Sequence, residues 1–224
     1  MTNILKLENI NYSYIDGGYE RVILKDLCAE FEDNTFYTIL GPSGSGKTTL
    51  LSLIAGLDTC KSGEIYYKGK NIKEIGLGKY RRNCISVVFQ QYNLINYLTA
   101  VENVLVAMTE TDNKLPADKR NVAYNLLNRF GIVQSKADRM VGQLSGGEQQ
   151  RVAIARALAS NVDLIFADEP TGNLDTATES EIIQIFKELA HDYNKTIIVV
   201  THSNNVSEIS DHRLLLKDGV LNNL

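Results

Sequence analysis

The sequence has little of what would mark a secreted, membrane-spanning or nucleic-acid-binding protein. Its three cysteines are odd in number and lack C-x-x-C spacing, which favours a reduced, cytosolic compartment. A formal net charge of -4 leaves no basic footprint, so we expect no nucleic acid as a partner. No apolar run reaches the roughly 18 residues that a membrane helix requires, and charges come too early for a signal peptide. The composition therefore predicts a protein that neither crosses a membrane nor is exported unaided.

Histidines and repeats are also scarce. The three histidines have no metal-ligand spacing, and we expect His191 and His212 to be solvated. We find no internal repeat and no low-complexity linker in the 224 residues. The chain is therefore predicted to form a single domain over residues 1–224.

Short, nearly continuous apolar runs indicate strands that are buried on both faces, as in a parallel sheet covered by helices. Three runs are clear, and two further strands are predicted. They are Phe36–Leu40, Leu164–Ala167 and Thr196–Val200, with Cys84–Phe89 and Arg213–Lys217 as the further strands. Because stretches with helical spacing lie between them, the fold class is predicted to be α/β.

The two remaining regions have other patterns. Apolar residues in 4–12 and 22–27 flank the turn at Gly17-Gly18, which predicts a small N-terminal antiparallel β-layer. The stretch 98–159 is mostly helical in pattern, with Pro116 in the first turn of a helix that ends at Phe130 before Gly131. We therefore expect an inserted helical subdomain over 91–159, within a core formed by 1–90 and 160–224.

A glycine-rich segment follows the strand at 36–40 and fits the pattern G-x-x-x-x-G-K-[ST]. The residues expected to bind the cofactor here are Gly41, Pro42, Ser43, Gly44, Ser45, Gly46, Lys47, Thr48 and Thr49. Glycines allow the backbone N–H groups to converge on phosphate oxygens. Lys47 supplies a cation between the outer phosphates, and the Thr48 hydroxyl ligates Mg²⁺. A plain Gly-Ser turn is disfavoured because a helix, Thr49–Ala55, follows directly and ends at Gly56.

Two acidic residues, Asp168 and Glu169, follow the apolar strand Leu164–Ala167. Alone, such a pair is more often a solvated strand end. Beside a phosphate-binding loop, Asp168 is predicted to hold Mg²⁺ through its water shell, because Mg²⁺ prefers one or two carboxylates plus waters and phosphates. Glu169 is predicted to accept a proton from the attacking water as general base.

A second helix start has features of an anion site. Ser145 and Glu148 stand at capping-box spacing, so a helix is predicted to begin here. Gly146 and Gly147 leave its N-terminus bare of side chains, and the exposed N–H groups favour an anion. On this segment alone, an ordinary helix cap is the simpler interpretation.

Together, these residues closely resemble the ABC ATPase family over essentially the whole chain. The resemblance rests on motifs in the family's order: the phosphate loop, Gln90 as the Q-loop glutamine, Leu144–Glu148 as the signature motif, Asp168-Glu169, Gly172–Asp175 as the D-loop, and His202 as the switch histidine. Tyr14 matches the aromatic residue that stacks on adenine, although Tyr12 or Tyr19 could compete for this role.

The resemblance implies an ATPase in which two copies pair head to tail around ATP and Mg²⁺. Catalytic residues would be Lys47, Gln90, Glu169 and His202, and metal ligands would be Thr48, Gln90 and Asp168. Across the dimer, Ser145, Gly146, Gly147 and Asp175 would complete the nucleotide site. The partners would be a second copy and an integral membrane permease. The chain would then be cytoplasmic and peripheral on the inner face of the cell membrane.

Details of 81–82, 88–94 and 98–104 resemble the subgroup that handles lipoproteins, macrolides and antimicrobial peptides. Glu148 replaces the commoner Gln of the signature, with a length that suits the cap, so we expect no loss. Asp33-Asn34-Thr35 stands where members usually have Gly-Glu, which affects only a turn.

Three other protein classes share some of these motifs. A P-loop GTPase is disfavoured because no N-K-x-D motif is present, and a non-enzymatic scaffold is disfavoured because Lys47 and Glu169 are both retained. An ABC ATPase without a transport role, such as one in iron–sulfur cluster assembly, is left open by the size of the chain.

Overall fold

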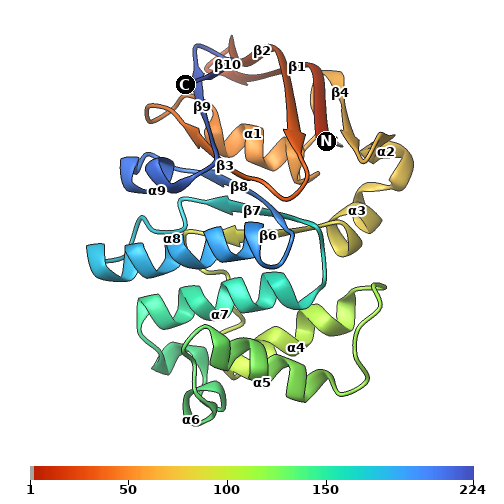
Figure 1. Cartoon of the computed structure of the whole chain (residues 1–224). Coiled ribbons are helices and arrows are strands. Elements are labelled where there is room, and N and C mark those ends of the chain that lie inside the picture. Colours follow the sequence, from red (N-terminus) through yellow and green to blue (C-terminus); the bar gives the residue numbers. More distant parts are fainter. Residues whose placement is uncertain (1–2) are drawn as a thin grey trace.

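An antiparallel sheet at one end of the molecule is formed by the N-terminal strands. The computed structural model describes residues 3–224. Strands β1 (Asn3–Asp16), β2 (Tyr19–Glu32), β4 (Ser62–Tyr67) and β5 (Lys70–Asn71) lie in the order β2-β1-β4-β5 (Figure 1). All their pairings are antiparallel, which confirms the predicted N-terminal β-layer. Within this sheet, β4 and β5 are strands that the sequence analysis does not predict.

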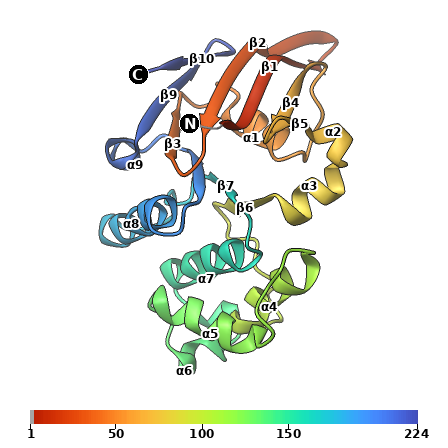
Figure 2. The same cartoon turned by 45° about the vertical axis from the view of Figure 1, so that its right-hand side comes forward.

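The second sheet lies between this layer and most of the helices (Figures 1 and 2). Its strands are β3 (Phe36–Leu40), β6 (Ile85–Phe89), β7 (Leu164–Asp168), β8 (Thr196–Val200), β9 (His212–Lys217) and β10 (Val220–Asn223), in the order β10-β9-β3-β8-β7-β6. The pairings are parallel except that of β9 with β10. The predicted α/β fold with a mostly parallel sheet is confirmed.

Both faces of the central strands of this second sheet are buried, and alternate residues of these strands enter different cores. On β7, Phe166 packs in a cluster with α1 (Lys47–Ile54) and the β-layer, whereas Ile165 packs with α7 (Gly146–Ala159) and α8 (Thr176–His191). This two-sided burial accounts for the continuous apolar runs in the sequence.

The remaining helices mostly follow β6 and lie together at the opposite end from the β-layer (Figure 2). They are α4 (Ala100–Glu110), α5 (Lys119–Arg129), α6 (Gln134–Ala137) and the 3-10 turn Val141–Gln143; elsewhere lie α2 (Ile72–Ile75), α3 (Leu77–Asn83) and α9 (Asn204–Ile209). The division at 91–159 stays a prediction. Among residues 3–224, no helix is long and apolar enough to span a membrane.

One predicted helix begins later than expected. Pro116 was assigned to its first turn, but α5 starts at Lys119, after Asp118. The Asp118 side chain accepts a hydrogen bond from the Asn121 backbone N–H at 3.0 Å, so this residue provides the cap. The end was predicted well: α5 stops at Arg129, and Gly131 has φ +78°.

Candidate active site

The loop 41–46 joins the end of β3 to the first residue of α1. Gly46 occupies the N-cap position, and no side chain of the described residues caps this helix. The Lys47 ammonium donates to the carbonyls of Gly41 (2.9 Å) and Pro42 (3.1 Å), so it lies over the loop. Since α1 starts at Lys47 rather than at Thr49, Lys47 and Thr48 belong to its first turn. Its free N–H groups and positive dipole end are suited to an anion.

Two glycines of the loop are required by their surroundings. A Cβ at Gly41 would lie 2.5 Å from the Leu216 carbonyl oxygen. Gly46 has φ +96°, and a Cβ there would lie 2.6 Å from Ile23 Cγ2. Backbone can therefore follow the tight path of the loop only without side chains at these positions.

A cleft of about 340 Å³ opens beside this loop. Its lining residues are Tyr14, Ile23, Ser43, Gly44, Gly46, Lys47, Thr48, Thr49 and Glu169. The structure therefore brings together predicted residues from the N-terminal layer, the glycine loop and the acidic pair. Ile23 was not predicted, because a single apolar residue on a strand gives no signal of its own.

The three tyrosines that could reach adenine occupy different environments. Tyr14 lines the cleft and is 42% exposed. The Tyr12 hydroxyl instead donates to Asp58 at 2.6 Å, and Tyr19 is 80% exposed beyond the cleft lining. An aromatic ring that faces a cleft with one side open is suited to stacking. The geometry therefore favours Tyr14 over both rivals.

Asp168 ends β7 next to the glycine loop and lacks full hydrogen bonding. Its Oδ1 is buried and has no hydrogen-bond partner among the described residues. Burial, and then the neighbouring Glu169 carboxylate, raise the pKa of Asp168 above its ordinary value, while the Thr48 hydroxyl and the Lys47 ammonium oppose this rise. An unpaired buried carboxylate oxygen beside a hydroxyl is a suitable position for a hard cation.

Glu169 is held in an unusual conformation with its carboxylate fully engaged. It has φ +45°, which costs on the order of 1 kcal/mol or more for a non-glycine residue. Its carboxylate accepts from the Thr201 hydroxyl (3.0 Å) and the His202 backbone N–H (3.2 Å). His202 Nδ1 lies 2.9 Å from the other oxygen. The structure thus joins the two residues predicted as base and switch histidine, and adds Thr201.

Gln90 lies after β6, but its side chain contacts the D-loop. Its amide Nε2 lies 3.4 Å from Asn173 Oδ1, and Asn173 Nδ2 donates to the Gln90 carbonyl at 3.3 Å. Gln90 is not among the residues that line the cleft. The described hydrogen bond of the Gln90 side chain is thus with Asn173, and not with Thr48 or Asp168, the other two predicted metal ligands.

The predicted capping box at the start of α7 is confirmed. The Ser145 hydroxyl accepts from the Glu148 backbone N–H at 3.3 Å, and the Ser145 backbone N–H donates to Glu148 Oε2 at 2.9 Å. Lys136 donates to the other Glu148 oxygen, and this contact, with the hydrogen bond from Ser145, holds the pKa of Glu148 below its usual value. Glutamate therefore suits this position as expected.

The two signature glycines lie so close to neighbouring side chains that there is no room for a Cβ at either position. A Cβ at Gly146 would lie 2.8 Å from the Tyr92 hydroxyl oxygen, and one at Gly147 would lie 2.5 Å from Thr178 Cγ2. Thr178 belongs to the first turn of α8, whose cap is Asp175: the Asp175 carboxylate accepts from the Thr178 N–H (3.0 Å) and hydroxyl (2.7 Å). Gly147 therefore brings the starts of α7 and α8 into direct contact.

None of the signature or D-loop residues lines the cleft beside the glycine loop. Ser145, Gly146, Gly147 and Asp175 are all absent from that lining. A single chain thus presents two separate features suited to anions.

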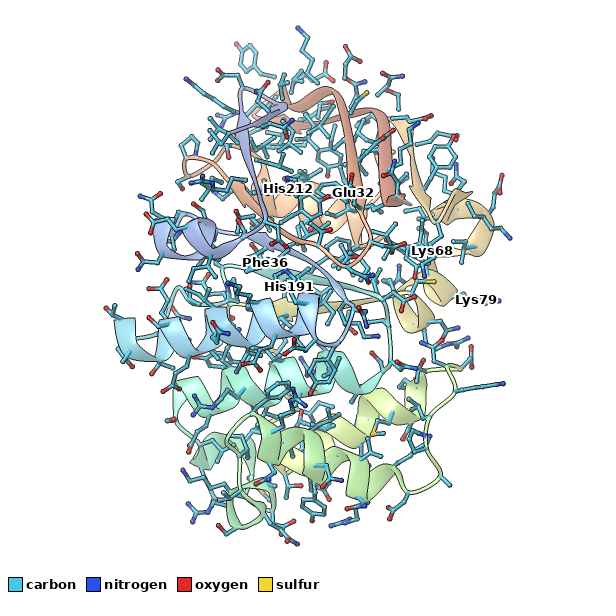
Figure 3. The ribbon with its side chains drawn as sticks, viewed as in Figure 1. Glu32, Phe36, Lys68, Lys79, His191 and His212 are labelled. Atoms are coloured by element: carbon cyan, nitrogen blue, oxygen red, sulfur yellow. The ribbon has the colours of Figure 1, made fainter. Side chains whose placement is uncertain are left out.

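His191 and His212 are both exposed, as expected, but each also has a partner in the structure. His191 Nε2 lies 3.0 Å from an Asp211 oxygen that also accepts from the Phe36 backbone N–H. The His212 ring stacks on Tyr37 at 5.1 Å between centroids. Figure 3 shows both histidines close to Phe36, at the beginning of β3. Their partners come from distant segments, so the local sequence gave no sign of them.

A glycine loop between a parallel strand and a helix, with its lysine over the loop and a carboxylate pair at the end of a nearby strand, defines a P-loop nucleoside triphosphatase. Comparison with known proteins gives the family. The family model described as "ABC transporter" matches residues 24–172.

Relatives extend over nearly the whole chain. The uncharacterized ABC transporter ATP-binding protein YclH of Bacillus subtilis is 43% identical over 97% of this chain and 95% of the relative. The lipoprotein-releasing system ATP-binding protein LolD of Psychrobacter arcticus is 39% identical over 98% of both chains.

Comparison with solved structures indicates the same family. The dimeric ABC transporter cassette MJ0796 superimposes with a TM-score of 0.87 at 40% identity, over 97% of this chain and 96% of that one. A post-hydrolysis dimer of MJ0796 with ADP and Pi gives 0.88 at 38% identity, over 98% of both chains. The chain therefore belongs to the ABC transporter family, as an ATP-binding cassette that hydrolyses ATP.

The contact of Gly147 with Thr178 predicts a steric effect on stability. Alanine normally favours a helix by about 1 kcal/mol over glycine, but here its methyl group would collide with Thr178. We expect Gly147→Ala to lower the free energy of unfolding by about 1–3 kcal/mol, as overpacked sites do. Urea unfolding followed by circular dichroism measures this change.

Thr178→Ser provides the matched rescue, because it removes the colliding methyl group and keeps the hydroxyl bonded to Asp175. The double variant should recover most of the lost stability. Equal stability of Gly147→Ala and the unmodified protein would contradict the packing argument.

Proposed function

We propose that this cassette pairs head to tail with a second copy on binding ATP and so drives an integral membrane permease. The observation that carries the proposal is the separation, within one chain, of the cleft from the signature residues 145–147. A second copy would place its signature helix start over this cleft. The dimeric structures of MJ0796, a protein about 40% identical, support such an arrangement.

The glycine loop is proposed to bind the phosphates of ATP. Backbone N–H groups of 41–46 and the first turn of α1 would donate to phosphate oxygens, and Lys47 would turn from the loop carbonyls to the outer phosphates. Tyr14 would stack on the adenine, with Ile23 beside it. Thr48 and Thr49 lie at the same end of α1.

Mg²⁺ fits the oxygens beside the loop. Thr48 and Asp168 would hold it, because Asp168 has a buried oxygen without a partner among the described residues. Gln90 would join them only after leaving Asn173. When bound, Mg²⁺ supplies positive charge that offsets the charge of the phosphates.

Glu169 is proposed as the general base for the attacking water. It lines the cleft, and its carboxylate is held by Thr201 and His202 at the end of β8. His202 would orient the carboxylate and contact the outer phosphate, since its side chain is 71% exposed at the rim. Water would attack once a second copy has covered the cleft.

Glu169→Gln tests the assignment of the base. Glutamine keeps the size and the hydrogen-bonding oxygen but does not accept a proton at neutral pH. We expect ATP binding to remain within about twofold and turnover to fall by roughly 10²–10⁴, the range for general-base removal. Phosphate release measures turnover, and a turnover equal to that of the unmodified protein would remove Glu169 from this role.

Ser145→Arg tests the shared site. Ser145 is exposed and lies outside the cleft of its own chain, so arginine there should leave nucleotide binding to the isolated chain nearly intact. It should abolish hydrolysis and ATP-dependent pairing, because the side chain would enter the position of the second copy's nucleotide. Loss of binding in the isolated chain to the same extent would count against a site shared by two copies.

A role with a membrane permease has consequences for the location of the cassette and for the substrate that is transported. We place the cassette in the cytoplasm, peripheral on the inner face of the cell membrane. We propose export or sensing of a lipoprotein, peptide or macrolide-like substrate; the relative named as a lipoprotein-releasing system ATP-binding protein supports the first of these. A role without transport, such as iron–sulfur cluster assembly, is the competing proposal.

Purification of tagged Glu169→Gln protein with ATP from its own cell membranes separates these two roles. We expect a stoichiometric membrane protein with several spans, identified by mass spectrometry. A soluble iron–sulfur assembly partner in its place would overturn the transport role.

A further inference from the structure

A carboxylate outside the cleft holds the two loops that carry Glu169 and His202. Glu179 lies in the first turn of α8, and its Oε1 accepts from the Ser203 hydroxyl at 2.8 Å and from the Thr171 hydroxyl at 3.2 Å. Its Oε2 accepts from Asn205 Nδ2 at 3.2 Å. Thr171 follows the acidic pair and Ser203 follows the switch histidine, so one side chain connects the segments that leave β7 and β8.

These contacts continue to Glu169 through a short hydrogen-bonded path. The Ser203 backbone N–H donates to the Thr201 hydroxyl oxygen at 3.0 Å. That hydroxyl in turn donates to Glu169 Oε2 at 3.0 Å, and Thr201 is fully buried. Ser203 is therefore fixed at both its backbone and its side chain, by Thr201 on one side and by Glu179 on the other.

The hydrogen bonds of Glu179 matter for these loops because few other contacts fix the positions of Glu169 and His202. Glu169 has a positive φ of +45°, a conformation that persists only where the surroundings impose it. His202 is 71% exposed, and its described side-chain contact is with Glu169. The place of the imidazole is thus set mainly by the backbone of 201–203.

We propose that Glu179 is a positioning residue for ATP hydrolysis. By its hydrogen bonds with Thr171 and Ser203, it keeps the Glu169 carboxylate and His202 in their positions relative to each other. It does not line the cleft, so it acts through these loops and does not contact the nucleotide. The inference rests on the proposed roles of Glu169 and His202.

The chemistry of the contacts predicts which substitutions are tolerated. All three described donors are neutral, a pair of hydroxyls and an amide, so an acceptor oxygen matters more than a charge. Glutamine at position 179 retains one such oxygen. Alanine leaves the hydroxyls of Thr171 and Ser203 without this acceptor, and Thr171 is only 5% exposed.

Steady-state hydrolysis by Glu179→Ala, Glu179→Gln and Glu181→Ala tests the proposal. Glu181 lies on the same helix, and its carboxylate, which pairs with Arg151, belongs to a side chain that is 66% exposed, which makes it a matched control. We expect Glu179→Ala to lower kcat about tenfold or more, since small displacements of reacting groups are costly. KM and ATP-dependent pairing should change by less than about twofold. Glu179→Gln should keep at least about half of kcat, and Glu181→Ala should match the unmodified protein.

Ser203→Ala gives a second, milder route should Glu179→Ala unfold, because it removes the side-chain contact and keeps the backbone bond to Thr201. It should lower kcat in the same way, and the double variant should be no worse than Glu179→Ala alone. An unchanged kcat in Ser203→Ala and in folded Glu179→Ala overturns the inference. So does a fall in kcat that is matched by an equal loss of pairing. Glu169→Gln in the same assay separates the two failures, because full turnover there would overturn the role of Glu169 itself.

Discussion

The parallel ladder of the second sheet is the constraint on which the site depends. Its register places Ile39 of β3 opposite Val200 of β8, and Val200 opposite Asp168 of β7. The carboxyl ends of these strands therefore lie at one edge, where the glycine loop, the acidic pair and the switch histidine each begin. A slip by one residue would exchange the buried faces of a strand and move its last side chain away from this edge.

The site itself is costly, and the two apolar clusters offset that cost. The positive φ of Glu169 and the unpaired Asp168 oxygen both oppose folding. They are tolerated because the strands that carry them are buried on both faces, where each apolar side chain contributes roughly 1.5–3 kcal/mol. Strain and incomplete bonding are thus concentrated where a nucleotide and a cation would relieve them.

Much of this fold could be predicted from the sequence because its signals are local. Runs such as 36–40 and 196–200 match β3 and β8 residue for residue, since burial on both faces leaves no charged positions. The spacing of Ser145 and Glu148 likewise predicts the capping box at the start of α7. Contacts between distant segments could not be predicted, as for Gln90 with Asn173 and for Glu179 with Ser203. Pro116 misled for a related reason, because Asp118 competes with it as a helix start.

The absence of a side chain at Gly147 has a mechanical consequence. Its backbone packs directly against the Thr178 side chain, so the beginnings of α7 and α8 form one closely packed junction. A rotation of α7 must then displace the first turn of α8, which also carries Glu179. Torque applied to the helical end of the molecule would reach the catalytic edge of the sheet through this junction, and the phosphate site would in turn resist or permit that rotation.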